Sequence, residues 1–121
     1  MKHIKIYEDL TNIINVDDII EKYGYDNAEF FLKFILKGKK VKIINGYDSK
    51  QNINEEVIGI LTNIFYISTS GFIIARFENA VFKNGIYLDR DIIINRATIS
   101  CDKYLDFDTA DMIIKSKKYN L

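Results

Sequence analysis

The densest group of chemically versatile side chains in the sequence is acidic. The segment CDKYLDFDTAD, residues 101–111, carries carboxylates at Asp102, Asp106, Asp108 and Asp111. An Asp-x-Asp pair begins many calcium loops, but such a loop also needs a glycine at its sixth position and a glutamate at its twelfth. Neither residue follows in register. Asp108 and Asp111 suit the first turn of a helix instead, so we expect no metal site here.

Nucleophilic catalysis lacks a base in this sequence. Cys101 is the only cysteine and His3 the only histidine, and His3 is expected in a strand or at a frayed terminus. A cysteine nucleophile needs a base within hydrogen-bond reach, and a thiolate–imidazole zinc site would need ligands from other chains. Paired carboxylates among Glu55, Glu56 and Asp91 stay open as an acid–base site, although nothing singles them out. We therefore expect a protein that is not an enzyme and has no cofactor.

The stretch FILKGKKVKIINGY, residues 34–47, places a basic Lys-Gly-Lys-Lys run between two apolar patterns. A phosphate-binding loop needs several glycines before the N-terminus of a helix. Here a single glycine, Gly38, follows the expected C-terminus of a helix, where Lys37 complements the helix dipole. The pattern favours a joint between a helix and a strand over a phosphate site.

Partner binding is the remaining role that the polar residues suggest. Tyr47 is an aromatic residue in an otherwise polar loop, residues 45–54, and such a residue often anchors a partner. The basic positions expected beside it are Lys40, Lys42, Lys50, Arg76 and Arg96. Gathered into one patch they would suit phosphates or an acidic protein. A solvated face of the sheet is the alternative interpretation.

Length and charge describe a single ordinary domain. The chain has 121 residues, with 17 basic and 17 acidic side chains, and it contains no proline and no Gly/Ser-rich linker. We expect one domain, residues 1–121, without a global field that attracts nucleic acid or membranes. No run of about 18 apolar residues and no signal-peptide core is present, so we expect a cytoplasmic protein and no membrane partner. Its richness in isoleucine, lysine and asparagine is typical of AT-rich genomes and their phages.

Three helices are predicted, at about 16–23, 27–37 and 109–118. Each is preceded by a capping residue with a carboxylate three positions on, with caps at Asn15, Asp26 and Asp108. The first helix has a single apolar stripe.

The second helix, residues 27–37, is apolar around most of its circumference. Such a face must meet the first helix, another chain or both, and Phe30 and Phe34 are the residues we assign to self-association. A DNA-recognition helix would show polar and basic side chains instead. The helical pair is therefore interpreted as structural.

Strand patterns fill the middle of the chain. After a first strand from residue 40, the expected strands are 55–68, 71–78, 80–83, 86–89 and 92–100, with an edge strand at 3–7. Asn84-Gly85 predicts a type I′ hairpin that places Phe82 opposite Tyr87. Gly59 predicts a bulge or a sharp bend.

These patterns together predict an α+β fold. An N-terminal helical hairpin and a C-terminal helix pack on a strongly bent, mainly antiparallel sheet of five to six strands, or on a small barrel. The connections between strands are too short for parallel crossovers.

The segment from residue 27 to residue 100 resembles SH3-like and Sm-like small β-barrels, in which a helix precedes five bent antiparallel strands. The resemblance is carried by Gly46, by Gly59 and by the run INRATI, residues 94–99. It implies RNA bound on the face of an oligomeric ring. The long polar loop at 45–54 departs from the tight turn of that family.

The sequence thus predicts a small, non-enzymatic binding protein that acts through protein–protein contacts. An accessory or inhibitory factor of a phage or mobile element is the role we expect. The alternative is an Sm-like or SH3-like barrel that binds RNA or single-stranded nucleic acid through lysines, arginines and stacked tyrosines. A self-associating homo-oligomer is a third form.

Overall fold

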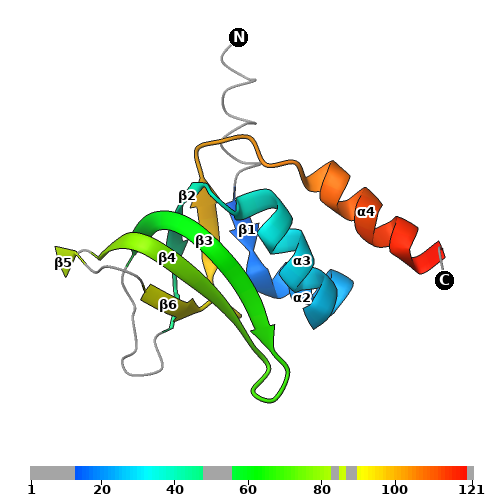
Figure 1. Ribbon diagram of the computed structural model, residues 1–121, viewed down its shortest axis with the longest axis horizontal. Helices are drawn as coiled ribbons and strands as arrows, with labels where there is room; N and C mark the ends of the chain where they lie inside the picture. The colour runs from blue at the N-terminus through cyan, green and yellow to red at the C-terminus, as the bar shows by residue number, and fades with distance from the viewer. Residues whose placement is uncertain (1–12, 48–55, 83–84, 87–89, 120–121) are drawn as a thin grey trace, which may run out of the picture.

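The computed structural model describes residues 13–47, 56–82, 85–86 and 90–119. These ranges form three helices and one antiparallel sheet of seven strands (Figure 1). The helices are α2 (Val16–Tyr23), α3 (Tyr25–Leu36) and α4 (Phe107–Tyr119). The strands are β1 (Ile13–Asn15), β2 (Lys40–Ile44), β3 (Val57–Ile67), β4 (Phe72–Phe82), β5 (Gly85–Ile86), β6 (Arg90–Ile93) and β7 (Thr98–Cys101). The α+β class and the helical hairpin leading into an antiparallel sheet are confirmed. The predicted strand at 3–7 lies outside the described residues.

The sheet is strongly bent and open. Its strands follow the order β1-β7-β2-β3-β4-β5, and β6 also pairs with β4. Figure 1 shows β3 and β4 curving together around the helical hairpin. Among the described residues, continuous pairing does not close the sheet into a barrel. A single isolated bridge, between Tyr47 and Ile93, joins the part of the chain described after β2 to β6. Of the two predicted forms, the bent sheet is the one observed.

A bulge between β3 and β4 contributes to this bend. Between the pairs Ile58–Val81 and Ile60–Glu78, β3 has one residue and β4 has two. Asn79, one of the two, has a φ of 55°, in the left-handed region. An extra residue of this kind increases the local twist and bends the strand.

Gly59 lies opposite this bulge, as the sequence predicted. A Cβ at Gly59 would be 3.0 Å from Phe77 Cδ1 and 3.1 Å from the Cα of Ala80, so a side chain here would require its neighbours to shift by a few tenths of an ångström. The predicted strands at 71–78 and 80–83 are one strand, β4, because the bulge absorbs the irregularity at Asn79 without ending the ladder.

The predicted strand at 92–100 is wrong in one respect, because a turn at 94–97 divides it into β6 and β7. The Asn95 side chain fixes this turn. Its Oδ1 accepts a hydrogen bond from Ile73 N at 2.8 Å, and its Nδ2 donates to Gly71 O at 2.8 Å. Before this turn, β6 pairs with β4, and after it, β7 pairs with β2. The turn therefore carries the chain from a position beside β4 to a position beside β2.

The predicted hairpin register is also wrong. Phe82 pairs with Gly85 and Val81 with Ile86, so Phe82 does not lie opposite Tyr87. The glycine belongs to a strand and not to the predicted two-residue loop.

Two of the predicted helix caps are replaced by tertiary contacts. The Asn15 side chain makes no bond to α2, and its Oδ1 accepts a hydrogen bond from the Thr98 hydroxyl at 3.1 Å. Helix α3 begins before Asp26, at Tyr25, whose ring stacks on Tyr66 with the ring centres 5.0 Å apart. α2 still begins at Val16, as predicted, whereas α3 begins two residues earlier than predicted.

The third cap is displaced in the same direction. Helix α4 begins at Phe107, so Asp108 lies inside its first turn. Asp106 is the capping residue, because its Oδ1 accepts a hydrogen bond from Thr109 N at 3.1 Å. The helix starts two residues earlier than predicted, and the Phe107 ring at its start stacks on Phe31 of α3 with the ring centres 6.0 Å apart.

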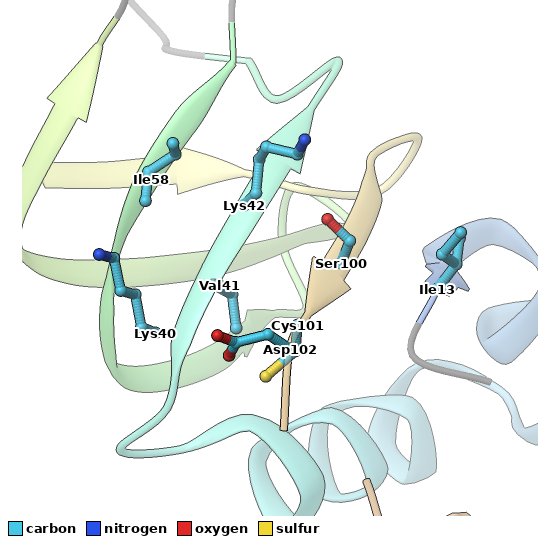
Figure 2. Close-up of a pocket in the computed structure, with 8 residues that line it drawn as sticks. All are labelled: Ile13, Lys40, Val41, Lys42, Ile58, Ser100, Cys101 and Asp102. Carbon is cyan, nitrogen blue, oxygen red and sulfur yellow. The ribbon is translucent and has the colours of Figure 1, made fainter. Parts of the chain in front are cut away.

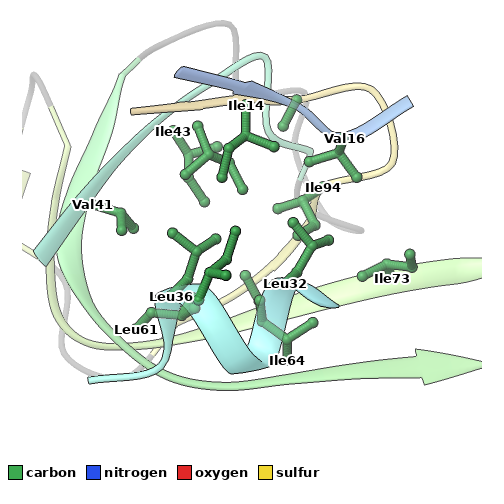
Figure 3. Close-up of a cluster of buried hydrophobic side chains, with 14 of the residues drawn as sticks. Ile14, Val16, Leu32, Leu36, Val41, Ile43, Leu61, Ile64, Ile73 and Ile94 are labelled. Carbon is green, nitrogen blue, oxygen red and sulfur yellow. The ribbon is translucent and has the colours of Figure 1, made fainter. Parts of the chain in front are cut away.

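The core lies between the sheet and α3. Figure 3 shows Leu32 and Leu36 of α3 pointing towards the side chains that the sheet supplies, with Ile43 and Ile14 above them. The fully buried large side chains include Phe77, Leu32, Ile35, Leu36, Ile43, Leu61, Ile64, Ile73, Ile92, Ile94, Ile99 and Ile114. The alternation along β2 is as predicted, with Val41 and Ile43 facing the core and Lys40 and Lys42 facing away.

Candidate functional site

The structure divides the predicted partner-binding residues between separate places. Lys40 and Lys42 lie together on the outer face of the sheet, the face turned away from α3, while Tyr47 and Arg96 line a pocket elsewhere. Arg76 lies on β4 beside β6. Lys50 lies outside the described residues. The basic positions therefore do not form one patch.

Pairing between strands arranges the outer face in two rows. In one row Lys40 lies beside Ile60, and Ile60 beside Glu78. In the other, the neighbours run in the order Ile13, Ser100, Lys42, Ile58 and Val81. Side chains alternate between the two faces of a strand, so both rows point away from the core.

Apolar side chains in these rows remain exposed. Ile60 and Val81 are each 42% exposed, and Ile13 is 49% exposed. We call Lys40, Lys42, Ile58, Ile60 and Val81 the outer strip. Two hollows of about 370 and 380 Å³ adjoin it, and Lys40 and Ile58 line both of them. Figure 2 shows the residues that line the first hollow. We call the two neighbouring hollows together the groove. Contiguous exposed apolar surface of this kind marks contact sites.

The charges around the outer strip are mixed. Lys42 Nζ is 3.9 Å from Glu56 Oε1, a long contact between exposed groups that contributes little. Within the described ranges no carboxylate lies in ion-pair distance of Lys40. Asp102 and Glu78 line the two ends of the groove. The two central lysines thus have both apolar side chains and carboxylates as neighbours.

Tyr47 and Arg96 line a second pocket of about 620 Å³. The Tyr47 backbone is held by Ile93, with N–H···O distances of 2.9 and 2.7 Å in the two directions. Phe72, 40% exposed, also lines the pocket, and the turn that carries Arg96 is fixed by Asn95. We call this the Tyr47 pocket. It offers two exposed aromatic rings and one guanidinium to a ligand.

Arg76 is engaged by a carboxylate. Its Nε and Nη2 donate to the two oxygens of Asp91 at 2.9 and 3.1 Å, and its guanidinium lies 5.2 Å from the centre of the Phe65 ring. A bidentate pair of this type offsets the positive charge of the arginine. Arg76 therefore adds little to the attraction of an anionic partner.

The self-association residues lie on a helix whose apolar circumference is mostly covered. Helix α3 packs against α2, α4 and β3. Phe30 is half-buried, with Lys117 Nζ 4.2 Å from the centre of its ring, whereas Phe34 is 42% exposed. Self-association through Phe30 and Phe34 remains a prediction, and Phe34 is the member of the pair that a second chain would reach.

The acidic segment serves the attachment of α4. Asp106 caps α4, and the Asp111 carboxylate accepts hydrogen bonds from Tyr23 and Lys115. The hydrogen bonds that each aspartate accepts lower its carboxyl pKa. No group of three or more metal-ligating side chains gathers among the described residues.

The remaining candidates for chemistry are dispersed. Glu56 faces Lys42 and Asp91 faces Arg76, so these two carboxylates occupy different places, and Glu55 lies outside the described ranges. Cys101 is buried at the end of β7. None of the helices described is long and apolar enough to cross a bilayer.

Comparisons with protein-family models, curated proteins and solved structures gave no match. The resemblance to Sm-like barrels therefore stays a prediction. Sequence reasoning missed the apolar part of the outer strip and the role of Phe72. A signal for the strip was present, since the segment VIGILTNIFYI has apolar residues at both alternating sets of positions and must show some of them on the outer face.

Proposed function

We propose that this protein is a non-enzymatic binding protein that holds a protein partner on the outer strip, as an accessory or inhibitory factor does. The observation that carries the proposal is the exposure of Ile60 and Val81 beside Lys40 and Lys42 on a fully paired part of the sheet. Protein interfaces combine an apolar centre with a polar rim. The groove supplies both.

The mixed charges favour a protein over a nucleic acid at this face. Glu56, Glu78 and Asp102 lie close to the lysines, and carboxylates repel the phosphates that dominate nucleic-acid affinity. A protein partner can place opposite charges against both signs.

A matched pair of substitutions tests the proposal. The tagged full-length protein is recovered from its own host at low salt and washed at high salt, together with Ile60→Lys and Met112→Lys. Both variants replace an exposed apolar side chain with lysine, but Met112 lies on α4, away from the outer strip.

We expect a host protein to copurify with the wild type and with Met112→Lys, and to be lost with Ile60→Lys. Circular dichroism spectra of the variants confirm that they fold. The proposal is wrong if no protein copurifies, or if both variants retain it equally.

A second candidate function rests on the Tyr47 pocket. Exposed rings at Tyr47 and Phe72 beside Arg96 suit stacked bases and a phosphate. A helix followed by β2, β3, β4, β6 and β7 also fits the order that the Sm-like resemblance implies.

Two arginine variants test this candidate. Binding of a single-stranded oligonucleotide should weaken with added salt and with Arg96→Ala. Arg76→Ala is the control, because Asp91 already offsets that charge. Equal losses in the two variants would contradict the assignment of this pocket.

A further inference from the structure

The groove along the outer strip runs across the strands. It starts at Ile13 of β1 and reaches Val81 of β4, with β7, β2 and β3 between them. Neighbouring strands lie about 4.8 Å apart, so five strands span roughly 19 Å. A helix rises 1.5 Å per residue, and about 13 helical residues cover that distance.

The strands at the centre of the groove have no unpaired edge. β7 pairs on both sides, with β1 and β2, and β2 and β3 are likewise flanked by strands, whereas β1, at one end of the groove, is the end strand of the described sheet. A partner in extended conformation gains affinity by pairing along an open edge, so it could pair at β1 alone and not along the rest of the groove. A helix satisfies its own backbone groups and needs only side-chain contacts.

The lysines of the groove indicate which side chains such a helix would carry. Lys40 and Lys42 leave the central strand of the groove, and Figure 2 shows Lys40 leaning over the strand that holds Ile58. Ile13 lies two strands to one side of Lys42, and Val81 lies two strands to the other side. Two strand spacings are roughly 10 Å, which is the length of about two helical turns. Apolar positions at both ends and a carboxylate between them would match this order.

We propose, on the basis of the function proposed above, that the partner presents an amphipathic α-helix of about 13 residues with a central acidic side chain flanked by apolar ones. The carboxylate meets Lys40 and Lys42. The apolar side chains cover Ile58, Ile60 and Val81 at one end and Ile13 at the other.

Synthetic peptides of about 14 residues test the inference. The first has leucines at both ends of one helical face and a glutamate between them. The second has lysine in place of that glutamate, and the third has a central proline that breaks the helix. Each carries a fluorophore, and its binding to the full-length protein is followed by fluorescence anisotropy.

We expect the glutamate peptide to bind about tenfold more tightly than the lysine and proline peptides. The double variant Lys40→Glu/Lys42→Glu should bind the lysine peptide more tightly than the glutamate peptide. Ile60→Lys should weaken the glutamate peptide, and Met112→Lys should leave it unchanged. Wild-type protein that binds all three peptides equally, binds none, or releases the glutamate peptide to a single-stranded oligonucleotide would overturn the inference.

The host experiment separates this failure from failure of the proposed function. Suppose that the host partner is lost with Ile60→Lys but that the protein shows no preference among the peptides. The proposal of a helical partner would then be wrong, while the outer strip would still be a protein-binding face. If Ile60→Lys changed neither the recovery of the host protein nor the binding of the glutamate peptide, both the proposed function and the helical partner would be wrong.

Discussion

The Tyr23 hydroxyl of α2 donates a hydrogen bond to the Asp111 carboxylate of α4. Lys115, one turn further along α4, also reaches Asp111, at 2.9 Å, and Lys22 lies 3.7 Å away. Together with the stack of Phe107 on Phe31, these contacts fasten α4 to the helical hairpin.

This attachment predicts a dependence on acid. The hydrogen bonds from Tyr23 and Lys115 hold the pKa of Asp111 below its ordinary value of 3.8. The folded state thus binds fewer protons at this site than the unfolded state. The stabilisation is fully present above the ordinary pKa, and it is lost as the pH falls through the lower pKa of the folded state.

Asp111→Asn should remove this part of the acid dependence. Urea unfolding midpoints of the wild type and the variant, measured between about pH 6 and pH 2, should differ most at the upper end and converge at the lower. Tyr23→Phe should show the same trend, because it removes the first donor. A constant difference across this range would contradict the prediction.

Asp106, and not Asp108, should control the start of α4. Asp106→Ala removes the acceptor for Thr109 N and should lower the melting temperature and the helical signal in circular dichroism. Asp106→Asn keeps an oxygen at the same place and should retain most of the stability. Asp108→Ala is the control, with a smaller effect. The reverse order would show that the cap predicted from the sequence was right.

Buried and exposed positions of α3 should differ sharply in their tolerance of truncation. Phe31 is 3% exposed, and Phe31→Ala should reduce the free energy of unfolding by about 3–5 kcal/mol. Phe34 is 42% exposed, and Phe34→Ala should cost about 0.5 kcal/mol or less. Denaturant titration measures both. If Phe34 joins two copies, Phe34→Glu should also lower the mass measured by light scattering at high concentration.

Gly59→Ala should be costly, although alanine is small. Its Cβ would lie 3.0 Å from the Phe77 side chain and 3.1 Å from the backbone of Ala80, so both neighbours must shift by a few tenths of an ångström. We expect a loss of about 1–3 kcal/mol in the free energy of unfolding. Ile60→Ala, one residue further on β3 and on the outer face, is the control, with a much smaller change. Equal losses would show that the bulge can relax.

Local patterns predicted the parts of the fold that depend on neighbours in the sequence. The stripe along α2, the apolar circumference of α3 and the alternation of β2 each repeat within a few residues. Gly59 marked a bulge for a similar reason, because an isolated glycine inside a strand pattern has a local cause.

Features that depend on distant partners were missed. β1 has three residues, too few to show a period, and exists through its pairing with β7. The turn at 94–97 depends on bonds from Asn95 to Gly71 and Ile73. The helix starts moved to Tyr25 and Phe107 because those rings stack on other elements. No local pattern contains these contacts.

Dependence on distant partners also explains why only part of the candidate site was predicted from the sequence. Sequence reasoning placed Lys40 and Lys42 on one face, which is correct, but it could not place Ile60 and Val81 beside them. That neighbourhood depends on the register of three strands and on one extra residue in β4. A slip of one residue would have turned Ile60 into the core.

The position of β7 has a consequence for the order of folding during synthesis. β7 is inserted between β1 and β2, so these two early segments gain their shared neighbour only when residues 98–101 have been made. A chain leaving the ribosome can form the helical hairpin and the β3–β4 ladder beforehand, because those contacts are local. Closure of such long loops is slow compared with helix formation. One side of β2 therefore stays without its partner strand until residues 98–101 have been made, which leaves an unpaired strand edge on the nascent chain.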